Sequence, residues 1–218
     1  MDRICRKIWG DIVIPVVVQL EPADFDEKVR TPGKTFLEMI PRPNTKEFER
    51  APYWRQSLRD LYRAYGKICA YSAHWIPPDT GQPSVDHFIP KNVAPELAYE
   101  WSNFRLSSLK MNSRKWTYQD VLDPFTIGRD WFILDFPSLL VMPNGNLSLI
   151  NSEKVQATIK RLRLNDDESC VEHRQIWIKG YCKGDIAFDF LGRYAPFIAY
   201  ELDRQNLRTT ISSLMNFN

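Results

Sequence analysis

The spacing of apolar residues predicts a helix over residues 53–65. Trp54, Leu58 and Leu61 recur at intervals of four and three residues, which places them on one helix face. Gly66 follows as a residue suited to the left-handed conformation that ends a helix. The same reasoning predicts short strands at 12–19, 68–71 and 85–90, turns at 77–81 and 143–146, and helices at 104–113, 153–164, 169–180 and 195–207.

The stretch 85–113 is predicted to run strand, loop, helix. His87 lies near the exit of the strand, and Asp86 precedes it. Asn103 stands where a helix N-cap would stand, because an asparagine side chain can accept a hydrogen bond from the first helical turn. Asn112 then falls on the third turn of the predicted helix.

No internal repeat or linker divides the sequence, and the elements predict an α+β fold. Residues 1–52 are expected to form a strand and an irregular segment that wraps over the rest, because proline and charge are frequent after residue 20. Residues 53–125 are expected to form the central core. Residues 126–218 are expected to form a mainly helical extension packed on that core.

The composition is that of an ordinary globular protein, with 44% hydrophobic and 26% charged residues. The longest apolar run, 12–18, has 7 residues and contains a proline, so no membrane span is expected. The start of the chain has no signal-peptide-like apolar core, which favours a cytoplasmic protein. Four dispersed cysteines without a CxxC pair, together with three histidines, predict reduced thiols and no structural zinc.

The net charge is only +2, and the basic excess lies in the middle of the chain. Residues 53–125 carry nine Lys and Arg against seven Asp and Glu, whereas the flanking parts are balanced. Such a local basic cluster can contact phosphates, although a solvated helix face is the favoured explanation for such a run taken alone. Between Asn103 and Lys115 the basic residues are Arg105, Lys110, Arg114 and Lys115, with no acid among them.

Asp86, His87 and Asn112 together supply what hydrolysis of a phosphodiester needs. A carboxylate and an amide oxygen are hard ligands that suit Mg²⁺ or Mn²⁺. A histidine is suited to take a proton from water near neutral pH. Asn103 follows His87 by 16 residues (103 − 87), and Asn112 follows Asn103 by 9 (112 − 103).

In these residues the chain resembles the HNH endonucleases, which have a ββα-metal fold of a hairpin and a helix. The resemblance covers about residues 66–116. A looser likeness over 10–205 is to stand-alone bacterial HNH proteins, including some from anti-phage defence operons. The matching stretches are Val85-Asp86-His87-Phe88-Ile89-Pro90-Lys91, Trp101-Ser102-Asn103-Phe104-Arg105-Leu106 and Met111-Asn112-Ser113-Arg114-Lys115.

The resemblance implies a role for each residue of the motif. His87 would be the general base, with Asp86 and Asn112 as metal ligands and Asn103 as the brace of the loop that carries the base. Arg114 and Lys115 match a basic tail near the substrate backbone; Lys91, Arg105 and Lys110 are added as candidate nucleic-acid contacts. Many family members carry two CxxC zinc pairs, and here those places read Cys69-Ala70-Tyr71-Ser72 and Ser108-Leu109-Lys110-Met111, so no structural zinc is expected.

Each of these residues also has a structural explanation. N-capping alone would account for Asn103, Lys91 is equally an ordinary surface lysine, and His74 is expected to pack in the core or at an edge. No individual aromatic residue can be assigned a base-stacking role from the sequence.

The predicted function is a metal-dependent endonuclease that hydrolyses DNA, plausible as the effector of a bacterial anti-phage defence system. An ATPase or another subunit from the same operon is a candidate partner, because the modest charge predicts weak DNA affinity. Two alternatives stay open. One is an HNH nuclease that cleaves RNA, and the other is a non-catalytic nucleic-acid-binding or assembly subunit.

Overall fold

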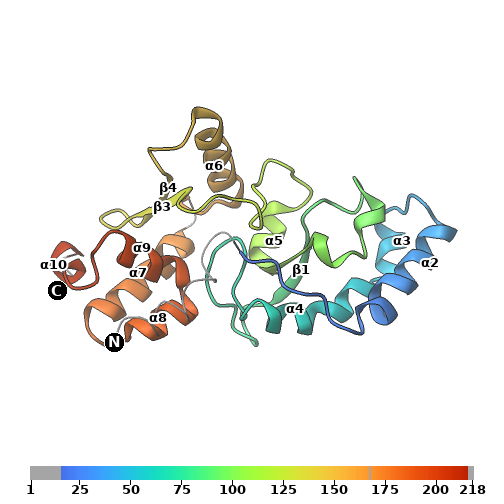
Figure 1. The fold of residues 1–218 in the computed structure, drawn as a ribbon, viewed down its shortest axis with the longest axis horizontal. Coiled ribbons are helices and arrows are strands. Elements are labelled where there is room, and N and C mark those ends of the chain that lie inside the picture. Colours follow the sequence, from blue (N-terminus) through green and yellow to red (C-terminus); the bar gives the residue numbers. More distant parts are fainter. Residues whose placement is uncertain (1–15, 167, 216–218) are drawn as a thin grey trace. The chain divides into compact units, whose positions relative to one another are not determined.

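The computed structural model describes residues 16–166 and 168–215, which belong to two compact units (Figure 1). The N-terminal unit comprises Val18–Ala70 and Ile76–Gln119, and the C-terminal unit comprises the described part of the remaining chain. The architecture is α+β, and each unit contains a two-stranded antiparallel sheet among helices. None of the described helices combines the length and the apolar character needed to cross a membrane.

The segment from residue 20 to 52, predicted to be irregular, is largely helical. It contains a π-helical turn at Asp26–Arg30, α2 (Thr31–Met39) and α3 (Thr45–Arg50). Pro32 lies in the first turn of α2, where a proline is compatible with a helix, so it is not the breaker that the sequence suggested. Of the strand predicted at 12–19, residues 12–15 lie outside the described residues, and 16–19 form no strand.

The helix predicted over 53–65 is confirmed as a 3-10 turn, Tyr53–Ser57, that continues into α4 (Leu58–Ala64). Gly66 follows with φ +58°, the left-handed conformation expected of it. The strand predicted at 68–71 is absent; Ala70 instead donates one backbone hydrogen bond to the Leu106 carbonyl at 2.8 Å.

The next part of the chain forms two strands and a helix. β1 (Pro83–His87) pairs antiparallel with β2 (Phe104–Ser108), and His87 lies opposite Phe104 in the register. α5 (Leu109–Lys115) follows β2 directly, and α4 and α5 both contact the two strands. The connection between the strands contains short 3-10 turns at Pro95–Leu97 and Trp101–Asn103.

The helix predicted over 104–113 is therefore wrong in its first half. Phe104–Ser108 is extended because it pairs with β1, and its first four residues are all buried. The helix is capped by Ser108, whose hydroxyl accepts from the Met111 N–H, rather than by Asn103. Asn112 consequently lies in the first turn of α5 and not in a third turn.

The C-terminal unit has a β-hairpin and a group of helices around its own core. β3 (Phe132–Asp135) pairs with β4 (Leu140–Pro143), and the predicted turn at 143–146 follows. Val155, Ile178 and Leu191 are fully buried in this core. The predicted helices at 153–164, 169–180 and 195–207 are confirmed in type, with shifted ends. The helices are α6 (Leu149–Leu162), α7 (Glu168–Cys182), α8 (Phe188–Tyr194), α9 (Pro196–Arg204) and α10 (Ile211–Met215).

Candidate functional site

A groove of about 870 Å³ in the N-terminal unit is bordered by β1 and α5. The volume is in the range of ligand-binding clefts. The residues that border it come from 43–58, 83–92 and 109–117, so the folded unit assembles the groove from distant parts of the sequence. Among its lining residues are Trp54, Asp86, His87, Lys91, Asn112 and Trp116.

His87 is the last residue of β1 and is 7% exposed. Its Nε2 lies 2.8 Å from the Ala98 carbonyl oxygen, which can only accept, so Nε2 carries the proton and Nδ1 presents its lone pair. Nδ1 has no hydrogen-bond partner among the described residues. The edge-on rings of Trp54 and Phe104 hold the imidazole in place, each with its centroid 5.2 Å away.

Burial, and after it the nearby positive charge of Lys91, lowers the pKa of His87 to about 3. The imidazole is therefore neutral at physiological pH. A neutral ring with a fixed tautomer is the form in which a histidine can accept a proton.

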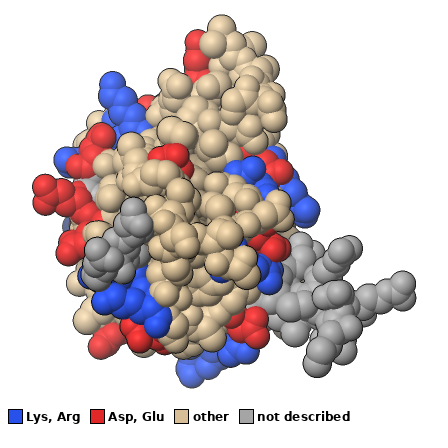
Figure 2. Space-filling model, turned by 90° about the vertical axis from the view of Figure 1, so that its left-hand side faces the viewer, with Lys and Arg blue, Asp and Glu red and all other residues tan. Residues whose placement is uncertain are grey.

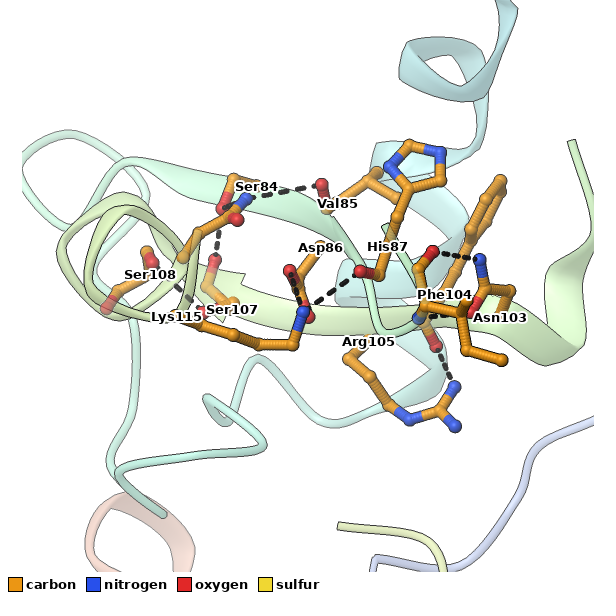
Figure 3. Close-up of polar contacts among 12 residues, drawn as sticks. Ser84, Val85, Asp86, His87, Asn103, Phe104, Arg105, Ser107, Ser108 and Lys115 are labelled. Carbon is orange, nitrogen blue, oxygen red and sulfur yellow. Dashed lines mark hydrogen bonds and ion pairs between the residues drawn. The ribbon is translucent and has the colours of Figure 1, made fainter. Parts of the chain in front are cut away.

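Asp86 is 2% exposed, and its carboxylate is paired with a buried lysine. The Lys115 ammonium lies 3.1 Å from Asp86 Oδ1 and donates to the His87 carbonyl at 3.0 Å (Figure 3). Neighbouring residues of a strand point to opposite faces, and Figure 3 shows the Asp86 carboxylate and the His87 ring diverging in this way. Both residues are nevertheless among those that line the groove.

Asn112, the fourth residue of α5, is among the residues that line the groove. Its Nδ2 donates to Ser84 Oγ at 3.1 Å and to the Val85 carbonyl at 3.3 Å. These two bonds fix the amide, and Oδ1 accepts no hydrogen bond from the described residues. A carboxylate from Asp86 and an amide oxygen from Asn112 are donors that fit Mg²⁺ or Mn²⁺.

Asn103 is buried and fastens the connection between β1 and β2. Its Oδ1 accepts from the Ile89 N–H at 2.8 Å, and its Nδ2 donates to the carbonyls of Ile89 at 3.0 Å and Leu97 at 3.1 Å. Ala98, which follows Leu97, provides the carbonyl that orients His87. The amide therefore stabilises the loop on which the orientation of the imidazole depends.

The structure separates the basic residues that the sequence grouped together. Lys91 lines the groove, with its ammonium 4.4 Å from the centroid of the Trp54 ring, and burial lowers its pKa. Lys110 is exposed and Arg114 is half-buried, and neither lines this groove.

Arg105 and Lys115, which were predicted to contact phosphates, lie in the interior instead. Arg105 is 3% exposed and donates to the carbonyls of Ser102 at 2.7 Å and Phe104 at 3.0 Å. Lys115 is fully buried against Asp86. Both cations satisfy groups of the protein, so neither is placed to reach a phosphate.

The structure also adds groove residues that the sequence did not single out. Arg55 is exposed at the groove, close enough to Lys91 for its charge to help lower the lysine pKa. Trp116 lies immediately after α5 and is 66% exposed. Nothing in the local pattern distinguishes these side chains from ordinary surface or core residues.

Within residues 16–166 and 168–215, no three or more His, Cys, Asp or Glu side chains lie together as a metal cluster. Neither a scan against protein-family models nor a search of curated proteins finds a match to this chain.

Proposed function

We propose that this chain is a metal-dependent endonuclease of the HNH type that hydrolyses DNA phosphodiester bonds. The observation that carries the proposal is one groove bordered by Asp86, His87 and Asn112, with the imidazole held in a single tautomer by Ala98. The order β1, β2, α5 supports it, because the motif resemblance implies a hairpin followed by a helix.

His87 acts as the base that takes a proton from the attacking water. Its Nε2–H is engaged by Ala98, so the proton can be accepted only at Nδ1. A phosphodiester bound nearby adds negative charge, which favours the protonated imidazole and strengthens it as a base. Asn103 keeps the loop in the shape that this orientation requires.

Asp86 and Asn112 are the residues that would hold Mg²⁺ or Mn²⁺. When bound, such an ion offsets the charge of the phosphate and stabilises the leaving oxygen. Lys115 fixes the Asp86 carboxylate and balances its charge inside the protein.

The small net charge of the chain, +2, supports delivery of the substrate by a second protein. Figure 2 shows basic and acidic side chains interspersed on one face of the molecule, without a large area of one sign. The lining of the groove includes the cations Arg55 and Lys91 and one exposed acid, Glu49. So few cations give weak attraction to DNA, and a partner such as an ATPase from the same operon would raise the local substrate concentration.

The test is cleavage of plasmid DNA and of total RNA in Mg²⁺, with and without EDTA. We expect nicking of the plasmid that EDTA abolishes and that His87→Ala lowers by about 10²–10⁴-fold, the contribution usual for a positioned base. The matched control is His173→Ala, a histidine of the C-terminal unit, which should keep wild-type activity. Circular dichroism of both variants checks that they fold.

Three results would contradict the proposal. If folded His87→Ala cleaves as fast as wild type, His87 is not the general base. Cleavage of RNA alone assigns the same groove to RNA. Absence of any wild-type cleavage, with nucleic-acid binding altered by His87→Ala, identifies a non-catalytic binding subunit.

A further inference from the structure

Trp116 is a large apolar side chain left mostly in solvent at the edge of the groove. It is 66% exposed, and its one ring contact among the described residues is edge-on to Tyr118, with the centroids 6.0 Å apart. Its indole N–H donates to no described residue. A tryptophan normally buries most of its surface. The exposed Trp116 ring buries little apolar area and therefore contributes little to the stability of the fold.

The backbone at Trp116 is also unfavourable for a tryptophan. Its φ and ψ are 44° and −124°, and the Tyr118 N–H donates to the Lys115 carbonyl at 3.0 Å. This is a turn in which the second residue has the positive φ of a type II′ turn, a position that strongly favours glycine. A bulky residue with positive φ is rare, and such residues are concentrated at functional sites.

The turn fixes Trp116 close to the candidate catalytic residues. Its N–H donates to the Asn112 carbonyl at 2.7 Å, so its backbone lies one helical turn from the proposed metal ligand. Leu109, 47% exposed, borders the groove from the same helix. Elsewhere the groove is bordered by the cations of Arg55 and Lys91.

An exposed aromatic ring that lines the same groove as two cations matches the chemistry of a nucleotide. An aromatic side chain binds a base by stacking on its face, and cations bind the phosphate backbone. The acid Glu49 borders the groove too, while the Asp86 charge is balanced by Lys115. A base inside a duplex is already stacked on both faces, so only an unstacked base can lie against the indole.

We infer that Trp116 is a stacking platform for an unpaired nucleobase, and that the groove takes nucleic acid with an unstacked nucleotide beside the scissile phosphate. The inference rests on the proposed nuclease function for the identity of the ligand. The preferred substrate is then single-stranded, gapped or otherwise opened DNA, rather than a continuous duplex.

The experiment measures binding, not cleavage. A fluorescein-labelled 20-nucleotide DNA strand, free or annealed to its complement, is titrated with the protein in EDTA and followed by anisotropy. We expect wild type to bind the single strand more tightly than the duplex. Trp116→Ala should weaken single-strand binding by about tenfold, since stacking of one base on an aromatic ring contributes an effect of this order.

Three companion variants separate stacking from a structural role. Trp116→Phe should retain most of the affinity, because a smaller ring still stacks. Tyr118→Ala, a matched exposed aromatic two residues away, should change the affinity less than about twofold. Trp116→Gly should lose affinity while its urea midpoint stays equal or rises, because glycine accepts the positive φ.

Equal single-strand affinity of wild type and folded Trp116→Ala would overturn the inference. An equal loss of affinity for single strand and duplex in Trp116→Ala would overturn it as well. The same holds if wild type binds neither the single strand nor the duplex. The nuclease proposal is judged separately by plasmid cleavage. If cleavage depends on His87 while Trp116→Ala binds DNA normally, the nuclease proposal is supported and the stacking role of Trp116 is excluded.

Discussion

At the scale of single residues, the Asp86 carboxylate and the Lys115 ammonium form an ion pair that is almost completely removed from solvent. The two side chains are 2% and 0% exposed. Isolated charges in an apolar interior are unstable, so each of these groups depends on the other. The Lys115 ammonium also bonds the His87 carbonyl, and it thereby links the carboxylate to the strand end that carries the imidazole.

Lys115→Met keeps the length and the apolar stem of this side chain but removes its charge. We expect it to lower the free energy of unfolding by about 3–5 kcal/mol, because the buried Asp86 carboxylate loses its counter-ion. Urea denaturation followed by circular dichroism measures this difference.

Lys110→Met is the matched control on the same helix, since Lys110 is exposed. Its effect should stay within about 1 kcal/mol. Combining Lys115→Met with Asp86→Asn should recover part of the loss, because no buried charge then lacks a partner. Equal stability of the Lys115 and Lys110 variants would show that the ion pair has no structural importance.

The sequence identified Asp86, His87 and Asn112, and the structure brings them to one groove. With one exception, it could not distinguish buried from exposed lysines, because burial is set by tertiary packing. One usable signal existed: Lys115 lies four residues after the buried Met111, and therefore on the inward face of the helix. The exposure of Trp116 had no such signal, since most tryptophans are core residues.

At the scale of elements, β2 is the main difference from the sequence prediction. Phe104 and Leu106 alternate with Arg105 and Ser107, as in a strand, but the polar pair is buried instead of facing solvent. Asn103 resembled an N-cap, and this favoured a helix. The pairing with β1 decides the outcome, because tertiary context overrides local propensity.

A close contact between α2 and the β1–β2 connection is carried by Gly33. A Cβ built there would lie 2.1 Å from Tyr99 Cγ, and Tyr99 directly follows Ala98, whose carbonyl orients His87. We expect Gly33→Ala to destabilise the protein by about 1–3 kcal/mol through overpacking. Gly145→Ala is the control, because no atom lies within 4 Å of its added Cβ and its stability should hardly change. Urea midpoints that shift equally would contradict this packing argument.

At the scale of the whole molecule, each unit buries a neutral histidine. His87 lies in the N-terminal unit and His74 in the C-terminal unit, and burial lowers the pKa of both to about 3. His74 Nδ1 donates to the Ser72 carbonyl at 2.7 Å, whereas its buried Nε2 has no partner among the described residues. His173 stacks on this ring at 4.7 Å, and Arg174 adds positive charge nearby. Protonating His74 therefore opposes folding.

His74→Phe should reduce the pH dependence of stability. The folded pKa of His74, about 3, is below the unfolded value of 6.5, so its contribution is present above pH 6.5 and is lost as the pH falls toward 3. Between pH 7 and 5 wild type should lose about 2 kcal/mol that the variant retains, and the stability gap between them should change by that amount. Urea titrations at both pH values measure the gap. Parallel losses in the two proteins would mean that His74 is protonated as readily in the folded state as in the unfolded chain.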